Sequence, residues 1–492
     1  MHAILTGLAL GAGLAVAQTA DFSFKLDAAR VAGPWRRVDL YPNTSLRNAP
    51  PPELAATVER EYGRPKIVRV WLPLDDMWDY RTGQYTFNFQ CGKDTYKDDH
   101  IKYKYDRDHI TETTVHFEDY MRAFSQHSDE LLLNVRRYER EVVDGRITMA
   151  QWKEVVKTGL LRYKKMFANL RYLEVLNEYW IGEFGKLDDD QYYAFYRVGY
   201  EIVNEVNQEL KPALPLLVGG PCVVGKPFRQ EDPDARPDQG NQGQRMYRFL
   251  DNYARDRNPA KKLDFISFHD YGLKSNVAAI ADYQSIIQGW LRKLALPEDL
   301  PLFETEIGVA GPVPDAAENL RQATGVSSFF YYTRHNPNHY LFPWVLYHNP
   351  IQLSLVQFAA GLKMAPFGAA MKMWSMHKGN EVLCQRQDSG VGGPLAVASM
   401  DGSSLVVQTW NYSDKPVNVE IALRGLPARL SAGTQLRQYL VDAEHSNCIG
   451  HAGTPCELQM VNQSSGTTPE SLKVKLEPHA LALWKLEAPG MN

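Results

Sequence analysis

The feature that most constrains the fold is a regular alternation, between residues 38 and 374, of short apolar runs and longer amphipathic stretches. This alternation is typical of repeated β-strand and α-helix units, in which helices connect parallel strands. It predicts eight strands, at residues 37–40, 65–74, 129–134, 173–176, 214–219, 263–268, 301–305 and 340–346. It also predicts helices at residues 149–169, 189–210, 242–257, 277–294 and 316–336.

Eight strands that are each followed by a helix close most economically as a ring, so we predict an α/β fold with a (β/α)8 TIM barrel. The chain has 492 residues, well beyond the roughly 250 of one such barrel, which leaves room for a second unit. A doubly wound open sheet is the alternative. It would usually show a glycine-rich phosphate-binding turn after an early strand, and the sequence has none there.

After residue 374 the pattern changes to short β-type runs separated by Gly, Pro, Asn and Asp, which predicts a C-terminal antiparallel β-sandwich. These runs are residues 395–399, 404–410, 417–423, 435–440, 472–476 and 480–485. Residues 21–32 precede the barrel and are expected to add a strand to the sandwich. The predicted domains are an N-terminal segment at 18–35, a catalytic barrel at 36–374 and an accessory sandwich at 375–492.

Residues 1–17 combine an apolar stretch with the small-residue sequence Ala15-Val16-Ala17, which predicts a secretory signal peptide and a secreted or periplasmic protein. The stretch is too short to span a bilayer, so no membrane association is expected. The net charge of −4 gives no indication of nucleic-acid binding. Asn-x-Ser/Thr sequons occur at Asn43, Asn411 and Asn462.

Five cysteines are too few for a disulfide scaffold, although Cys448 and Cys456 lie close enough in the chain to form a bridge in an oxidising compartment. No spacing of Cys and His resembles a metal site. We therefore expect neither a metal nor a cofactor.

Asn177 and Glu178 end the apolar run that forms the fourth predicted strand. In a TIM barrel the C-terminal ends of the strands build the active site, so a carboxylate there is presented to the substrate. The Asn177 amide can bind a sugar hydroxyl while Glu178 reaches the glycosidic oxygen. For that role Glu178 must be protonated, which requires partial burial or a nearby negative charge. The alternative is an ordinary strand-to-loop pair.

Glu304 and Glu306 end the seventh predicted strand. Retaining glycosidases need two carboxyl groups at about 5 Å, one to protonate the leaving group and one to attack the anomeric carbon. Because side chains alternate along a strand, both glutamates are expected to point the same way, with Glu306 nearer the open end. We therefore predict Glu178 as general acid/base and Glu306 as nucleophile.

Three further residues are expected around this pair. His269 and Tyr271, at the end of the sixth strand, would lie between the two glutamates, where the Tyr271 hydroxyl can keep Glu306 ionised. Arg69 lies inside an apolar strand and is costly to bury unless paired, so it is expected to bind Asn177 or Glu306. A lone histidine at a strand end is otherwise most often structural.

These motifs together resemble the clan-A glycoside hydrolases, and most closely family 39, which contains β-xylosidases and α-L-iduronidases. They are Ile67-Val68-Arg69-Val70-Trp71, Asn177-Glu178, Phe265-Ile266-Ser267-Phe268-His269 with Tyr271, and Thr305-Glu306. The resemblance covers residues 65 to 350 and implies a retaining mechanism with Glu178 as acid/base and Glu306 as nucleophile. It also implies that Trp344 lies beneath the sugar that is cleaved.

The sequence departs from the family beside the sugar-binding subsites. Tyr179 and Trp180 follow Asn177-Glu178 where many relatives carry Pro, and Asp270 stands where an aromatic residue is common. Trp180 is a second candidate for sugar binding, with core packing as an equal alternative. These departures leave the identity of the substrate undetermined, but they do not affect the expected catalytic mechanism.

The expected function is hydrolysis of an extracellular polysaccharide or glycoconjugate, β-xylosidase-like or directed at arabinose-containing glycans. Its partner is then an oligo- or polysaccharide, and the oligomeric state is left open. The alternatives are a catalytically inactive carbohydrate-binding barrel and a hydrolase of uronic-acid or microbial exopolysaccharides. A metal-dependent barrel hydrolase is a further alternative that lacks the expected histidine pairs.

Overall fold

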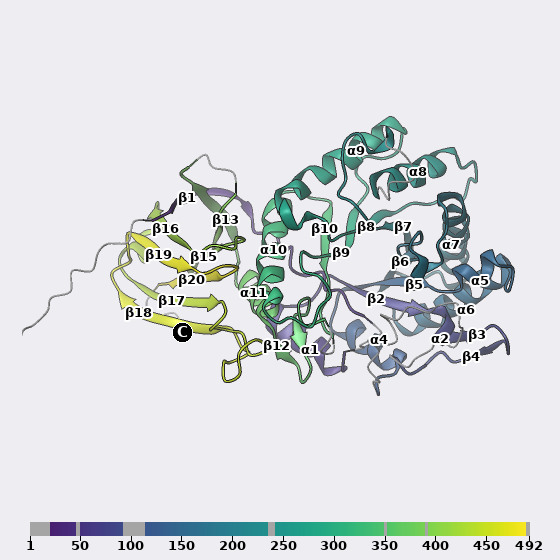
Figure 1. Cartoon of the computed structure of the whole chain (residues 1–492), viewed down its shortest axis with the longest axis horizontal. Helices are drawn as coiled ribbons and strands as arrows, with labels where there is room; N and C mark the ends of the chain where they lie inside the picture. The colour runs from purple at the N-terminus through teal and green to yellow at the C-terminus, as the bar shows by residue number, and fades with distance from the viewer. Residues whose placement is uncertain are drawn as a thin grey trace, which may run out of the picture.

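The computed structural model describes residues 20–45, 50–91, 114–234, 242–348, 352–388 and 392–488. It contains a curled parallel sheet with helices around its outside, and a second, larger sheet beside it (Figure 1). The expected signal peptide at residues 1–17 lies outside the described residues. Among the residues described, no helix is both long and apolar enough to cross a membrane.

The parallel sheet has seven strands in the order β10-β9-β8-β7-β6-β5-β2, and each neighbouring pair is parallel. Seven of the eight strands predicted from the sequence are thereby confirmed. Their bounds are β2 (Ile67–Pro73), β5 (Glu130–Arg136), β6 (Leu170–Val175), β7 (Leu217–Val223), β8 (Phe265–Asp270), β9 (Leu302–Ile307) and β10 (His339–Pro343).

The helices on the outside of the sheet follow the strands in the chain, as the alternation predicts. Two of them begin with a capping box, in which Thr148 and Asp188 each accept a hydrogen bond from the backbone of the residue three positions later. The helices are α1 (Glu53–Tyr62), α4 (Phe117–Gln126), α6 (Met149–Met166), α7 (Asp189–Leu210), α8 (Gln242–Arg255), α9 (Tyr283–Lys293), α10 (Glu318–Thr333) and α11 (Pro366–Ser375).

The strand predicted at residues 37–40 does not form. The carbonyl of Leu40 accepts a hydrogen bond from Lys66, just before β2, and that of Pro42 accepts one from Arg69 in β2. The carbonyl of Asn43 accepts one from Leu346, just after β10. Pro42 has no N–H to donate to a ladder, and the pairing shrinks to a single bridge between Asn43 and Arg69. An irregular segment therefore spans the space between the two edges of the sheet.

The interior of the curled sheet is built in layers, because every second residue of a strand points inward. Ile67, Leu132, Phe265 and Phe303, with Tyr172 packed against them, belong to one apolar cluster at one level. Two residues further along their strands lie polar side chains, all buried, which form the next level: Arg69, Asn134, Glu174, Ser267 and Thr305. This polar layer supports the strand ends where the expected site residues lie.

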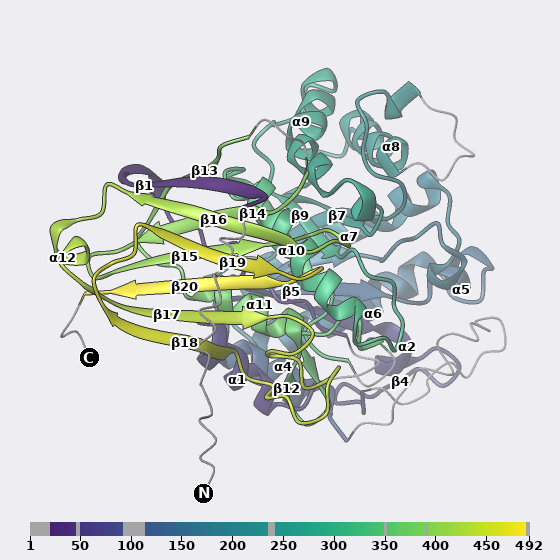
Figure 2. The ribbon, with the colours of Figure 1, turned by 60° about the vertical axis from the view of Figure 1, so that its left-hand side comes forward.

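The second sheet has nine strands in the order β18-β17-β20-β15-β14-β13-β1-β16-β19, connected by hydrogen bonds into one sheet (Figure 2). All neighbours are antiparallel except β1 and β16. The N-terminal strand β1 thus lies among strands from the C-terminal part of the chain. The bounds are β1 (Phe22–Pro34), β13 (Asn380–Arg386), β14 (Leu395–Met400), β15 (Ser404–Trp410), β16 (Val417–Arg424), β17 (Thr434–Val441), β18 (Gln459–Gly466), β19 (Ser471–Leu476) and β20 (Leu481–Glu487).

Helices α10 and α11 lie between the two sheets (Figure 1). Trp410 on β15 donates a hydrogen bond from its indole to Ser328 on α10, and its ring lies 5.9 Å from that of Trp374 on α11. The same aromatic group includes Trp35, stacked on His377. A continuous core therefore joins the nine-stranded sheet to the helices. A disulfide joins Cys448 and Cys456 in the loop between β17 and β18.

Candidate active site

The end of β6 turns sharply to present Glu178. Leu176 and Glu178 both have left-handed backbones, with φ of 61° and 42°. Residues other than glycine avoid this region, and each such residue costs about 1–3 kcal/mol, so it persists only where surrounding contacts impose it. Here the Leu176 N–H donates to the carbonyl of Val135, and the Glu178 N–H donates to the carbonyl of Cys222. The two flanking strands thus fix the direction of the Glu178 side chain.

Glu178 and Glu306 converge at the same end of the parallel sheet. One carboxylate oxygen of each, together with a ring nitrogen of His269, form a group whose atoms all lie within 4.8 Å of one another. Both side chains are nearly buried, with exposed fractions of 12% for Glu178 and 8% for Glu306. This spacing fits the pair of carboxyl groups, about 5–5.5 Å apart, that a double displacement at a sugar requires.

Glu306 accepts hydrogen bonds at both oxygens. Arg69 Nη1 donates to Oε1 at 2.8 Å, and the Tyr271 hydroxyl donates to Oε2 at 2.8 Å. Burial raises the pKa of Tyr271 well above its ordinary value, so its hydroxyl keeps its proton and remains a donor. Two such donors hold the carboxylate of Glu306 in one orientation.

Arg69 connects the site to the polar layer beneath it. Its guanidinium also donates to Glu174 and, from Nη2 at 2.9 Å, to Asn177 Oδ1. The side-chain oxygen of Asn177 therefore points at Arg69. The side-chain NH2 group of Asn177 points the other way and is a hydrogen-bond donor. The expectation that Arg69 binds Asn177 or Glu306 understates its role, because it binds both.

Glu174 is fully buried and was not singled out as a site residue. It accepts hydrogen bonds from Arg69, from Asn134 Nδ2 at 2.9 Å and from Thr305 Oγ1 at 2.7 Å. Burial alone would raise its pKa, but Arg69, His269 and the hydroxyl donors outweigh burial and hold the pKa of Glu174 below its ordinary value. A buried Glu on β6 opposite a buried Arg on β2 was the signal that could have revealed the pair.

His269 lies between the two catalytic candidates. Its Nδ1 is 2.7 Å from Glu178 Oε1 and 3.6 Å from Glu306 Oε2, while its Nε2 is 3.1 Å from Cys222 Sγ. Burial lowers the pKa of His269 to about 4, an effect that the nearby carboxylate of Glu306 only partly offsets. The imidazole is therefore neutral near pH 7.

Glu304 does not accompany Glu306, and the expectation that both point the same way is wrong. Glu304 lies 3.0 Å from His339 Nε2, and burial raises its pKa well above the ordinary value. The pairing of β9 shifts register against β8 and β10 next to this position. An irregularity of this kind breaks the strict alternation of side chains. Thr305 and Glu306 therefore both face the site, and Glu304 does not.

The aromatic candidates lie in two places. Trp344 stacks on Trp71 with ring centroids 5.2 Å apart, and its indole donates to Gln352. The guanidinium of Arg136 lies 4.1 Å from the centroid of the Trp71 ring. Trp180 lies elsewhere, with its indole donating to the Val224 carbonyl and its ring under Arg245. Trp71 in turn contacts Arg69. Of the two tryptophans predicted at the site, Trp344 is therefore the one connected, through Trp71, to the residues around Glu306.

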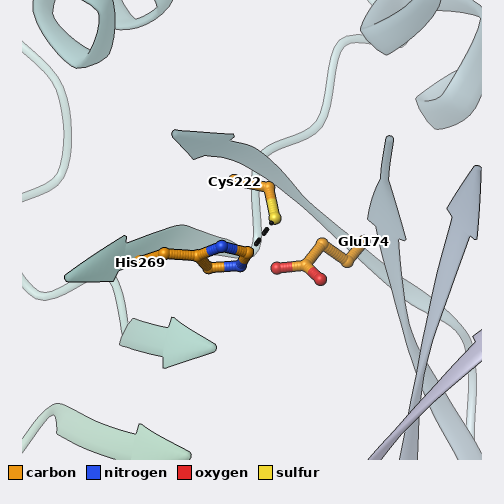
Figure 3. A group of neighbouring side chains, drawn as sticks. All are labelled: Glu174, Cys222 and His269. Carbon is orange, nitrogen blue, oxygen red and sulfur yellow. Dashed lines mark hydrogen bonds between the residues drawn. The ribbon is translucent and has the colours of Figure 1, made fainter. Parts of the chain in front are cut away.

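Within the part of the chain that the structure describes, two groups of side chains have metal-ligand chemistry: Glu174, Cys222 and His269, shown in Figure 3, and Glu178, His269 and Glu306. The first already surrounds a cation, because Arg69 Nη2 lies 2.8 Å from Glu174, 3.5 Å from His269 and 3.7 Å from Cys222. A metal ion there would be repelled by the guanidinium. In the second group Arg69 and Tyr271 already bind the oxygens of Glu306.

Neither a protein-family model nor a curated protein sequence matches the chain. Solved structures do match, and they share the fold of this chain. The resemblance to family 39 that the motifs indicate is confirmed at the level of the fold.

The individual structures are similar along nearly the whole chain. A monomeric β-xylosidase from Caulobacter crescentus CB15 has a TM-score of 0.66 and 14% identity, with 95% of this chain and 100% of that chain covered. A family 39 enzyme from Xanthomonas axonopodis pv. citri has a TM-score of 0.65 and 14% identity, covering 97% and 99%. An α-L-arabinofuranosidase from Thermotoga maritima has a TM-score of 0.61 and 12% identity, covering 95% and 100%.

Proposed function

We propose that the protein is a retaining glycoside hydrolase with Glu306 as nucleophile and Glu178 as general acid/base. The observation that carries the proposal is the pair of carboxyl groups within 4.8 Å, in which the two members have different surroundings. Glu306 has a cationic donor on one oxygen and a hydroxyl donor on the other. Glu178 faces a neutral imidazole. Different surroundings of this kind separate an ionised nucleophile from an acid that keeps its proton.

The reaction follows from these roles. In the first step Glu306 attacks the anomeric carbon, the glycosidic bond breaks, and the leaving oxygen takes the proton of Glu178. In the second step a water attacks the anomeric carbon and gives its proton to Glu178, while the bond to Glu306 breaks. Arg69 and Tyr271 stabilise the negative charge that returns to Glu306 at this point.

For the substrate we propose a β-xyloside or an arabinose-containing glycan of an extracellular polysaccharide or glycoconjugate, reached after secretion of the protein. The support is that similar solved structures include those of β-xylosidases and α-L-arabinofuranosidases. A second support is the Trp71–Trp344 stack, since aromatic faces beside a carboxylate pair suit a sugar ring. We further propose that residues 36–374 form the catalytic domain, a barrel that the irregular segment before β2 completes, and that residues 375–492 with the segment at 18–35 form a sandwich-like accessory domain.

The test uses two variants and a panel of aryl β-xylosides and α-L-arabinofuranosides. Glu306→Ala should lose turnover, and azide should restore it with a glycosyl azide of inverted configuration. Glu178→Ala should still release activated phenols, while natural leaving groups fail because nothing protonates them. Glu304→Gln is the matched control from the same strand and should keep activity. Full turnover by Glu306→Ala would exclude the assigned nucleophile.

The same panel addresses the other candidate functions. A catalytically inactive carbohydrate-binding protein would bind glycans without releasing phenol or sugar. A metal-dependent hydrolase would lose activity in EDTA, whereas we expect activity to persist. A hydrolase of uronic-acid polysaccharides would act on aryl glucuronides in preference to the pentosides.

A further inference from the structure

We propose that Cys222 is a positioning residue that fixes the tautomer of His269. The tautomer in turn determines which carboxyl oxygen of Glu178 carries the transferred proton. The inference rests on the proposed function, since it concerns the proton that Glu178 donates. Cys222 lies on β7, outside the sequence motifs. Figure 3 shows its thiol directed at the His269 imidazole, at the contact of 3.1 Å between Sγ and Nε2.

The surroundings of Nε2 favour the tautomer of the neutral ring that has no proton on this nitrogen. Nε2 lies 3.5 Å from Arg69 Nη2, and a guanidinium has donors but no acceptor. A proton on Nε2 would point at these donors. Burial raises the pKa of the Cys222 thiol well above its ordinary value, so the S–H is retained and can donate to Nε2. Nε2 is therefore the acceptor, and the single proton of the ring is on Nδ1.

The tautomer determines what His269 does to Glu178. With the proton on Nδ1, the ring donates to Glu178 Oε1 across 2.7 Å. An oxygen that accepts this bond is the carbonyl-type oxygen of the acid, so the proton passed to the leaving group is carried by Oε2. In the second step the same N–H stabilises the carboxylate while it accepts a proton from water. With the opposite tautomer Nδ1 would instead accept the acid's own proton and withhold it from the substrate.

Other charged and titratable groups face this unit from the neighbouring strands. They are Arg69 on β2, Glu174 on β6, Glu306 on β9 and Tyr271 just beyond β8. Arg69 Nη2 lies 3.7 Å from Cys222 Sγ, and an oxygen of Glu174 lies within 4.8 Å of Sγ. Tyr192 on α7 also interacts electrostatically with the thiol. Asn177 Oδ1, at 3.5 Å, is a second acceptor within reach of the thiol. Replacing the thiol therefore removes the donor to Nε2 and leaves the other charges in place.

The experiment compares side chains with and without a donor at position 222, in pairs of similar size: Cys222→Ser with Cys222→Ala, and Cys222→Thr with Cys222→Val. Cys384→Ala, which removes a half-buried thiol in β13, is the control. The pH dependence of kcat/KM is measured on 4-nitrophenyl β-D-xylopyranoside. In Ala and Val the high-pH loss of activity should move upward by about half a unit or more, because the tautomer that favours protonated Glu178 becomes populated. Ser and Thr should restore the wild-type profile.

A second readout does not depend on turnover. In ¹⁵N-labelled protein the two ring nitrogens of His269, assigned with a His269→Gln variant, report which one carries the proton. Wild type, Ser and Thr should show a protonated Nδ1 and a bare Nε2, and Ala and Val should show a shift toward the other tautomer. If the ring spectra of Ala and Val equal that of the wild type, or if the wild-type proton is on Nε2, the role of Cys222 is refuted. If no glycoside is hydrolysed while the ring spectra behave as predicted, the proposed function fails instead.

Discussion

Arg69 and Glu174 form a fully buried ion pair inside the curled parallel sheet, with Nη2 and Oε2 2.8 Å apart. Both side chains have no exposed surface, and both also contact residues of the candidate site. Two opposite charges are therefore placed one layer below the reacting groups. Arg69, which this pair holds in place, also orients Glu306 and Asn177. A change that disrupts the pair should therefore disturb both the sheet interior and the site.

Breaking this pair should destabilise the fold strongly. Arg69→Met leaves Glu174 buried without its cationic partner, and removal of one partner of a buried pair costs about 3–5 kcal/mol of unfolding free energy. The double variant Arg69→Met/Glu174→Gln should lose less than the sum of the single variants. Urea unfolding of the four proteins measures this coupling. Strict additivity would show that the pair does not act as a unit. The exposed pair of Arg292 and Glu298 serves as control, and Arg292→Ala should leave the unfolding midpoint unchanged.

Removal of the Tyr271 hydroxyl should affect turnover more than substrate binding. Its bond to Glu306 Oε2 involves a charged acceptor, and such bonds contribute about 1.5–3 kcal/mol. Tyr271→Phe should therefore lower kcat by roughly 10- to 150-fold, since charge returns to Glu306 when the glycosyl-enzyme breaks down. Steady-state kinetics on an aryl xyloside tests this. A rise of KM at unchanged kcat would assign Tyr271 to sugar binding instead.

Acid should destabilise the protein partly through His377, which is buried next to the nine-stranded sheet. Its ring nitrogens lie 2.9 Å from Ser399 Oγ and 3.3 Å from Gln408 Oε1, and burial lowers its pKa from 6.5 to about 3. Between these two values the unfolded chain takes up a proton that the folded protein does not. The free energy of unfolding therefore falls as the pH falls, by about 1.4 kcal/mol per pH unit for this one group.

The matched variant is His377→Gln, which keeps polar atoms but does not titrate. Its unfolding free energy, measured by urea titration between pH 5.5 and 4, should have a pH slope that is smaller than that of the wild type by about 1.4 kcal/mol per pH unit. Equal slopes in the two proteins would mean that His377 is protonated in the folded state.

Of the three sequons, only Asn462 is placed to carry a glycan after secretion from a eukaryotic cell. Asn43 and Asn411 are buried, and their amide nitrogens donate to the carbonyls of Thr305 and Lys415. Asn462 is exposed on β18, a strand at the edge of its sheet. Peptide mass spectrometry after enzymatic deglycosylation should find modification at Asn462, and Asn462→Gln should abolish it. A glycan on Asn43 or Asn411 in folded protein would contradict the placement of these residues.

The strands of the parallel sheet could be predicted because each is a short apolar run buried on both faces. In contrast, β18 has the polar sequence Gln459 to Gly466 and is exposed along most of its length, so it carries no apolar pattern that predicts a strand. The segment at residues 37–40 shows the opposite error. It has the composition of a strand, but Pro42 and contacts from two directions leave it irregular.

The site could be predicted where one motif holds a residue at a strand end, as with Glu178, Glu306 and His269. Glu174 and Cys222 could not be found in this way, because their roles depend on contacts between strands. The register shift beside Glu306, which separates it from Glu304, likewise depends on how β9 fits between β8 and β10.

The most direct test of the central claim is to trap the glycosyl-enzyme and locate the sugar. The wild-type protein is incubated with 2,4-dinitrophenyl 2-deoxy-2-fluoro-β-D-xyloside and with the corresponding α-L-arabinofuranoside. The fluorine slows both steps, whereas the good leaving group speeds only the first, so the intermediate accumulates. Peptide mass spectrometry should then show one fluoroglycosyl group on the carboxyl of Glu306. Attachment to Glu178 or Glu304, or steady hydrolysis of unfluorinated substrate without any covalent adduct, would contradict the account.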